Sequence, residues 1–399
     1  MNELLTISMI TREALRVLEN NLQFTKQVNR QYDSKYGVEG AKIGTVLNVR
    51  KPPRYVGRTG QALQVEGAVE SQVQVTLNTQ FGVDLQFSSQ DLALSIDDFS
   101  NRFIKPAIAT VANKIDNDGL AQYQNIYQSV GTPGTTPSTL LLYLQSGQKL
   151  DEAAAPHDGL RSLVLTPAMQ VQIVNALTGL FHQANAISQQ YMTGKMGTAI
   201  GYDWYMSQNC NTHTVGAFAG TPRVNGANQS GSSLITDGWT SGASTLNKGD
   251  VFTIADVYAV NPQSRQNTGS LQQFVVTATI SDTAGAKTIS ISPSIIASGA
   301  TQTVNAAPAD NALITVVGAA STATPQGLAF HRDAFTLVCA DLPLPGGVDM
   351  AARISDPQLG LSIRMVRAYD INTDNFPCRL DILYGWATLR AELACRIQG

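Results

Sequence analysis

The most constraining feature of the sequence is a run of alternating residues between positions 73 and 87. Apolar side chains occupy the odd positions, with Thr79 as the one exception, and polar residues or glycine occupy the even positions. A period of two places the odd side chains together on one face of a strand. The run therefore predicts a long β-strand with one buried face and one wet face.

Helical periodicity flanks this strand on both sides. Residues 11–32 repeat leucine at helical spacing on one narrow stripe, which is typical of a helix that docks against another element. Residues 95–128 carry a wider apolar stripe and predict a long helix. Pro106 falls inside the second segment and should bend that helix or mark its true start.

A βα unit and a composition change follow. Residues 162–165 predict a strand, and Thr166 and Pro167 are typical of the N-cap and first position of the next helix. From about residue 213 to 326 the chain is rich in Thr, Ser, Gly, Ala and Val, and short strand patterns alternate with turn signals. We expect an inserted all-β module there, built as a small barrel.

The segment from Lys42 to Val65 carries five cations and no acidic residue. Glycine and proline punctuate it, so it predicts an extended basic hairpin, with an ordinary surface loop as the alternative. The cations are Lys42, Arg50, Lys51, Arg54 and Arg58.

Composition restricts the function further. The charged fraction of 14% is below the value of about 25% for an average soluble domain, as expected for a subunit buried against copies of itself. A net charge of −3 argues against extensive direct contact with nucleic acid. Four scattered cysteines suggest neither a zinc site nor a disulfide framework. Without an evident signal peptide or an apolar run long enough to span a membrane, we expect synthesis in the cytoplasm and no membrane partner.

No catalytic constellation emerges from the motifs. His331-Arg332-Asp333 resembles a kinase catalytic loop, but Val338 stands where the required asparagine would be. The four histidines are far apart and form no metal-binding pattern. We therefore expect no enzyme activity, no cofactor and no metal.

Several stretches resemble the capsid protein of tailed double-stranded DNA bacteriophages. The fold of that family is named after the phage Hong Kong ninety-seven, and the likeness is greatest to its short-tailed branch, which carries an insertion domain. The stretches are residues 9–20, 44–52, 329–335 and 379–385.

The resemblance implies an α+β capsid fold with an inserted β-barrel. It implies five parts, which are an N-terminal arm, an extended loop, a peripheral domain with a spine helix, an axial domain and an inserted β-domain. The arm is residues 1–41, and the extended loop is residues 42–72. The peripheral domain is residues 73–130 and 357–392, and the axial domain is residues 131–212, 327–356 and 393–399. The inserted β-domain is residues 213–326.

The resemblance also implies a function and partners. The chain would be a major capsid protein that assembles with many copies of itself into an icosahedral head. We expect a separate scaffolding protein, a portal and only non-specific contact with packaged DNA. A β-rich tail fibre or adhesin is the main alternative, and an unrecognised enzyme and a non-viral nanocompartment shell are the others.

Charge suggests where subunits would meet. The basic extended loop would act as a strap over a neighbouring subunit and would need an anionic seat there. The predicted strap cations are Arg50, Lys51, Arg54 and Arg58. The predicted seats are Asp97, Asp98, Asp116 and Asp118 on the long helix.

Overall fold

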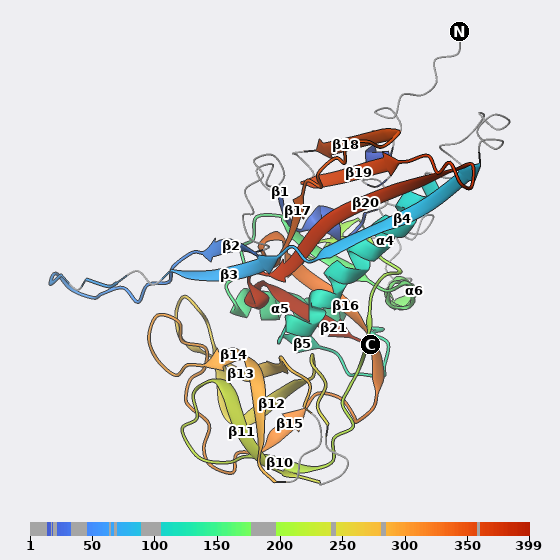
Figure 1. Cartoon of the computed structure of the whole chain (residues 1–399). Coiled ribbons are helices and arrows are strands. Elements are labelled where there is room, and N and C mark those ends of the chain that lie inside the picture. The colour runs from blue at the N-terminus through green and yellow to red at the C-terminus, as the bar shows by residue number, and fades with distance from the viewer. Residues whose placement is uncertain are drawn as a thin grey trace, which may run out of the picture. The chain divides into compact units, whose positions relative to one another are not determined.

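The structure is a computed structural model of the whole chain (Figure 1). It describes residues 14–16, 18, 22–32, 46–63, 65–67, 70–88, 105–176, 197–240, 245–280, 285–356 and 360–399. The chain divides into two compact units, each with its own sheets. The first unit comprises residues 1–49, 72–119 and 335–389, and the second comprises residues 50–71, 120–334 and 390–399.

The first unit is built on a six-stranded sheet. Its strand order is β1-β17-β20-β19-β18, and β4 also pairs with β20. β1 is parallel to β17, and the other pairs are antiparallel. The strands are β1 (Asn29–Tyr32), β4 (Thr79–Ser88), β17 (Phe335–Ala340), β18 (Met350–Asp356), β19 (Leu361–Arg367) and β20 (Asn375–Thr388).

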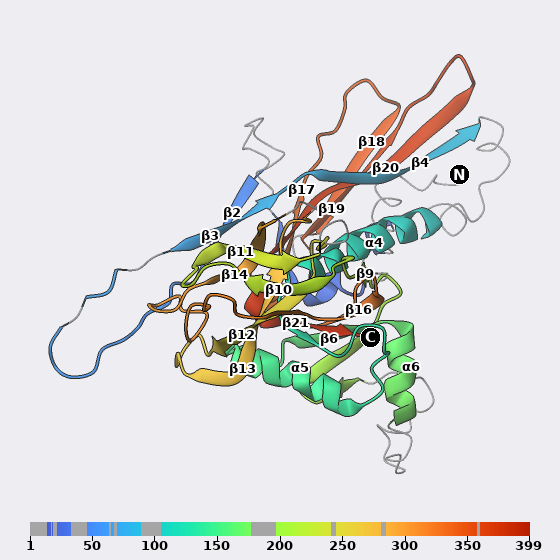
Figure 2. The ribbon, with the colours of Figure 1, turned by 90° about the horizontal axis from the view of Figure 1, so that it is seen from below.

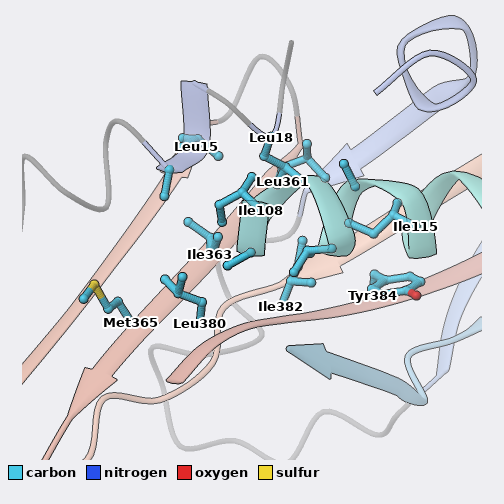
Figure 3. Close-up of a cluster of buried hydrophobic side chains, with 14 of the residues drawn as sticks. Leu15, Leu18, Ile108, Ile115, Leu361, Ile363, Met365, Leu380, Ile382 and Tyr384 are labelled. Atoms are coloured by element: carbon cyan, nitrogen blue, oxygen red, sulfur yellow. The ribbon is translucent and has the colours of Figure 1, made fainter. Parts of the chain in front are cut away.

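Helix α4 (Lys105–Leu120) packs on this sheet and closes the core of the first unit. Its apolar face, including Ile108 and Ile115, meets Ile363 and Leu380 from the strands (Figure 3). Pro106 is the second described residue of α4. Residues 89–104 lie outside the described part of the chain, so its role as a start marker stays a prediction.

The alternating run forms strands as predicted, but as two rather than one. β3 (Ser71–Thr76) and β4 are separated at Leu77 and Asn78. Val75 and Leu77 are buried in a small cluster with Val338, and Phe87 is buried in the main core. Apolar packing at odd positions thus continues after the interruption, but the two stretches pack in different clusters. β3 also pairs with β2 (Val46–Lys51) in a two-stranded sheet.

Both predicted helices end earlier in the structure than the sequence indicated. Within residues 11–32, residues 14–16 and 18 are helical, but Thr25–Gln27 is a 3-10 turn and β1 follows it. The leucine stripe stops at Leu22, and the parallel pairing of β1 with β17 sets the structure beyond it. The long helix ends at Leu120, where the 3-10 turn Ala121–Asn125 and the short β5 (Ser129–Val130) take over.

The segment before β1, which contains Phe24, packs closely against α4. Phe24 is fully buried, and its ring centroid lies 5.5 Å from that of Trp386 and 5.6 Å from that of Phe335. Gly119 lies against the same rings, so a Cβ there would sit 2.6 Å from Trp386 Cζ2 and 2.9 Å from the Phe24 ring. A side chain at this position would therefore push the aromatic seat apart.

The second unit contains a seven-stranded sheet with the order β5-β21-β16-β6-β8-β7, in which β9 also pairs with β16. Helix α5 (Leu140–Glu152) contacts β5 and β21. Figure 2 shows α5 beside β21. Helix α6 (Pro167–Ala176) follows β6, and Thr166 Oγ1 accepts a hydrogen bond from Met169 N, which confirms the predicted N-cap. The other strands are β6 (Arg161–Leu165), β7 (Thr198–Ala199), β8 (Tyr202–Met206), β9 (Thr212–Thr214), β16 (Ala323–His331) and β21 (Ala394–Gln398).

The remaining strands of the second unit form the predicted β-barrel. Their order is β10-β11-β14-β13-β12-β15, and an antiparallel bridge between Arg223 and Leu313 joins the two end strands. The barrel has its own apolar core, centred on Phe252 and Phe274. Its strands are β10 (Gly220–Val224), β11 (Gly231–Trp239), β12 (Val251–Val260), β13 (Asn267–Val276), β14 (Lys287–Ile295) and β15 (Ile314–Val316).

The α+β class expected from the sequence is confirmed, with strands in the majority. Among the described residues, no helix has both the length and the apolar character that a membrane crossing requires.

Candidate intersubunit surface

The base of the extended loop holds a cluster of cations around one carboxylate. Arg54 Nη2 lies 2.9 Å from Glu392 Oε1, and Arg390 Nε donates to the same oxygen at 3.2 Å. Lys51 belongs to this cluster electrostatically: burial lowers its pKa, the charge of Glu392 raises it, and Arg390 and Arg54 lower it. Three cations therefore share one carboxylate, and the cluster carries excess positive charge. Such an excess favours an anionic partner.

The two arms of the extended loop exchange charges with each other. Arg50 Nη1 lies 3.3 Å from Glu70 Oε2, and both side chains are largely exposed. The carboxylate of Glu66 accepts hydrogen bonds from the backbone N–H groups of Val56 and Gly57, at 2.7 Å each. The basic run contains no acid up to Val65, but the next two acids along the chain, Glu66 and Glu70, fold back onto it, which the sequence did not predict.

The chain between β2 and β3 also exposes large apolar side chains. Leu63 is 81% exposed and Val65 is 83% exposed, and Tyr55 and Val56 are more than half exposed. Four large apolar side chains are thus exposed on one loop, and apolar groups that gather at the surface favour an interaction site. The charge pattern of this loop predicted its cations but gave no sign of these exposed apolar side chains.

Arg58 lies in the same exposed stretch. Its Nη1 donates to the carbonyl of Gly60, two residues along the loop. Arg50 and Arg58 are thus the predicted strap cations that stay most open to solvent, whereas Lys51 and Arg54 are drawn into the cluster at Glu392.

Asp116 is not an exposed seat for a neighbouring subunit, and that prediction needs correction. Its side chain is 1% exposed and lies on the buried face of α4. Oδ2 accepts hydrogen bonds from the backbone N–H groups of Gln23 at 2.7 Å and Phe24 at 3.3 Å. Oδ1 accepts bonds from Thr25 N at 3.1 Å and Thr25 Oγ1 at 2.6 Å. Burial raises the pKa of Asp116, and these four donors oppose that shift.

The other predicted seats differ in their surroundings. Asp118 is partly exposed, lies 2.7 Å from Lys114 Nζ and accepts a hydrogen bond from the Tyr384 hydroxyl at 2.7 Å. It is already engaged within its own subunit, although one side remains open. Asp97 and Asp98 lie outside the described residues, so their role stays a prediction.

A sequence model of the P22 coat protein family, described as gene protein 5, matches residues 1–398. The chain belongs to the P22 coat protein family. It is a structural major capsid protein, and the capsid fold expected from the sequence follows from this membership. No curated protein sequence matched the chain.

Solved capsid structures are also similar to this coat protein. A structure from Mycobacterium phage Che8 is 12% identical, with a TM-score of 0.47, and the match covers 94% of this chain and 90% of the other. The mature capsid of bacteriophage PhiM1 is 11% identical, with a TM-score of 0.47 and coverage of 94% and 86%. The CUS-3 coat protein I-domain is 28% identical over 25% of this chain and 96% of its own, with a TM-score of 0.19.

As a coat protein, the chain assembles with copies of itself and is a component of the virion. The family assignment therefore favours the capsid hypothesis over the tail-fibre and adhesin alternative. Within the described part of the chain, no group of three or more His, Cys, Asp or Glu side chains is placed to hold a metal ion.

Proposed function

We propose that this coat protein builds the icosahedral head of a tailed phage around a double-stranded DNA genome, and that its extended loop straps a neighbouring subunit. Family membership supports the first part. The exposed apolar side chains of the loop, above all Leu63 and Val65, carry the second part. Exposed apolar side chains on a basic loop suit a partner surface that is apolar at its centre and acidic at its rim.

The remaining partners follow from charge and composition. A net charge of −3 supports only non-specific contact with the packaged DNA, so a portal and its machinery would load the genome. A separate scaffolding protein would guide assembly in the host cytoplasm. The role is structural, and we propose no enzyme activity for the chain.

The five parts of the subunit would have distinct tasks. The N-terminal arm would reach to neighbours, the peripheral and axial domains would form the shell wall, and the inserted β-domain would aid folding. The cation cluster at Lys51, Arg54 and Arg390 would accept a carboxylate from a neighbouring subunit. Asp97, Asp98 and the open side of Asp118 remain candidates to supply such a carboxylate.

Replacing Leu63 and Val65 together by serine is expected to impair shell assembly while leaving the subunit folded. Burying one such side chain contributes about 1.5–3 kcal/mol, so losing both at every contact should reduce association by at least about 100-fold. Sedimentation of shells from the variant, co-expressed with the neighbouring phage genes, measures the loss. The single change Gln61→Ala is the matched control on the same loop. Normal shells from the double variant would refute the strap.

Reversing Arg58 to glutamate is expected to slow assembly more than it lowers the final yield. Exposed ion pairs contribute only about 0–1 kcal/mol each, but they guide encounter and orientation. Light scattering at low and high salt measures this effect, which should shrink as salt rises. Arg58 is a cleaner choice than Arg54, because a carboxylate at position 54 would also repel Glu392 within the subunit. Equal assembly rates for variant and wild type at low salt would argue against electrostatic steering.

A further inference from the structure

The turn between β12 and β13 of the barrel is unusually well fixed for a surface turn. Asn261 Oδ1 accepts hydrogen bonds from Gln263 N at 2.9 Å and Ser264 N at 3.0 Å. Asn261 O accepts a bond from Arg265 N at 2.8 Å, and Asn261 Nδ2 donates to the carbonyl of Glu152, at the end of α5, at 3.0 Å. One asparagine thus shapes the turn and ties it to the helix.

Arg265 occupies a backbone conformation that L-residues seldom adopt. Its φ is 56°, in the left-handed region that favours glycine or asparagine. Such a conformation persists where the surroundings fix it, and these positions are frequent at functional sites. The free energy that this conformation costs the turn must therefore be offset by contacts that Arg265 makes elsewhere.

The Arg265 side chain reaches the extended loop of its own subunit. Nη2 donates to the carbonyl of Tyr55 at 2.5 Å, and Nη1 lies 3.4 Å from the carbonyl of Val56. The guanidinium offers several donors in a rigid plane, so it can bind two successive carbonyls.

Glu66 binds the N–H groups of the same peptide bonds whose carbonyls Arg265 binds. It binds the N–H groups of Val56 and Gly57, while Arg265 binds the carbonyls of Tyr55 and Val56. The peptide groups that join Tyr55 to Val56 and Val56 to Gly57 therefore each have a cation on their carbonyl and an anion on their N–H. Both bonds are charge-assisted, which makes them stronger than neutral ones.

We propose that Arg265 is a positioning residue, through which the inserted β-domain holds the extended loop of its own subunit in a fixed direction. The inference rests on the proposed strap function of that loop. A loop that is ordered before contact loses less conformational entropy on binding, so the brace would speed docking on a neighbour. Coupling through the barrel would also make loop order depend on a folded inserted domain.

The test compares three variants of the full chain. Arg265→Asn removes the guanidinium but keeps a residue that tolerates positive φ, so the turn itself should stay intact. Arg265→Lys keeps a charge and a donor but not the planar fork, and should rescue in part. Arg223→Asn is the matched control, since Arg223 is an exposed arginine on β10 of the same barrel.

Hydrogen exchange of the Val56 and Gly57 amides in the unassembled subunit is the deciding measurement. We expect protection of both amides to fall by about ten-fold in Arg265→Asn, with the thermal midpoint unchanged. The variant frees the carbonyls of Tyr55 and Val56, so the loop backbone moves more and the N–H groups of Val56 and Gly57 leave Glu66 more often. Unchanged protection would overturn the brace, whatever the role of the loop in assembly.

Assembly rates then separate the brace from the strap. A slower rate in Arg265→Asn, together with failed assembly in the Leu63 and Val65 double variant, supports both proposals. Normal rates in Arg265→Asn despite lost protection would overturn the step from brace to docking. Normal shells from the double variant would remove the strap while the exchange result still decides the brace.

Discussion

Replacing Asp116 by alanine is expected to lower the free energy of unfolding by about 3–5 kcal/mol, because it leaves several buried donors without an acceptor. The carboxylate holds three consecutive backbone N–H groups and a hydroxyl in the segment Gln23–Thr25. No water can replace it at 1% exposure without the segment moving. Without these four hydrogen bonds, Phe24 should lose its packing against the rings of Trp386 and Phe335. Urea unfolding of the unassembled subunit, followed by tryptophan fluorescence, measures the change, since Trp386 contacts Phe24.

Asp118→Ala is the matched control on the same helix. Asp118 is partly exposed and pairs with Lys114 four residues earlier, and such a helix pair contributes about 0.3–0.5 kcal/mol. The variant also removes the acceptor of the Tyr384 hydroxyl, which is one neutral donor, whereas Asp116 accepts from four. A loss of stability at Asp116 no greater than that at Asp118 would contradict the anchoring role.

Thr25→Val separates one donor from the rest of the Asp116 set. It removes the hydroxyl that donates to Oδ1 at 2.6 Å but keeps the three backbone bonds and the side-chain volume. A hydrogen bond to a charged group contributes about 1.5–3 kcal/mol, so the loss should be smaller than for Asp116→Ala. Equal losses in both variants would mean that the backbone bonds contribute little.

The parts of the fold that the sequence predicted share a physical cause, which is local information. Alternation between residues 73 and 87 marks two strands because side-chain direction repeats within each strand. Thr166 and Pro167 mark a helix start because a cap is made within one turn. The barrel was visible in composition because its short strands and turns each carry their own signal.

The errors arose where distant residues decide the structure. β1 forms because it pairs with β17, about 300 residues further along the chain, and it begins only after the helical leucine pattern has ended at Leu22. Asp116 looked like an exposed charge, since its partners lie more than 90 residues earlier. Glu66 and Arg265 meet on the loop backbone from opposite sides, and neither carries a local signal for that contact. The charge pattern of the sequence therefore predicted the basic extended loop but not the contacts of Glu66 and Arg265 that fix its backbone.

A second large effect is expected in a buried polar network of the second unit. Asp250, at the start of the barrel, lies 2.8 Å from His213 Nε2, and its Oδ2 accepts bonds from Gly216 N at 3.1 Å and Asn247 N at 2.8 Å. The Tyr123 hydroxyl lies 3.2 Å from His213 Nδ1. These three titratable residues are buried, with exposed fractions of 2% for Asp250, 5% for His213 and 3% for Tyr123.

Arg396 supplies the opposite charge in this network. It is fully buried on β21, donates from Nη2 to the carbonyl of Gly249 at 2.8 Å, and lies over the Tyr123 ring. Burial lowers the pKa of Arg396 to about 10, and the nearby Tyr123 and Asp250 oppose that shift. The guanidinium therefore stays charged at neutral pH, and Asp250 is the carboxylate that offsets it.

Two substitutions at Asp250 separate its hydrogen bonds from its charge. Asp250→Ala removes both, and we expect a loss of about 3–5 kcal/mol with unfolding of the barrel. Asp250→Asn can keep the bonds: its oxygen can accept from Gly216 and Asn247, and its amide can donate to His213 if that ring changes tautomer. It still leaves Arg396 without an anion, so we expect a loss of about 1–3 kcal/mol.

The relative size of the stability losses in Asp250→Ala and Asp250→Asn shows whether the network stabilises the coat protein by charge balance or by hydrogen bonds. Thermal unfolding with limited proteolysis of the barrel measures them, and Asp256→Asn is the control on β12, because Asp256 is exposed and its positive φ suits asparagine. Similar losses for the asparagine and alanine variants would mean that charge balance with Arg396 governs stability. A nearly neutral asparagine variant would mean that the hydrogen bonds do, and that the buried guanidinium is offset by Gly249 and Tyr123 alone. In either case β21, the last strand of the chain, is joined to the inserted barrel through this network, so truncation before Arg396 should destabilise the barrel as well as its own sheet.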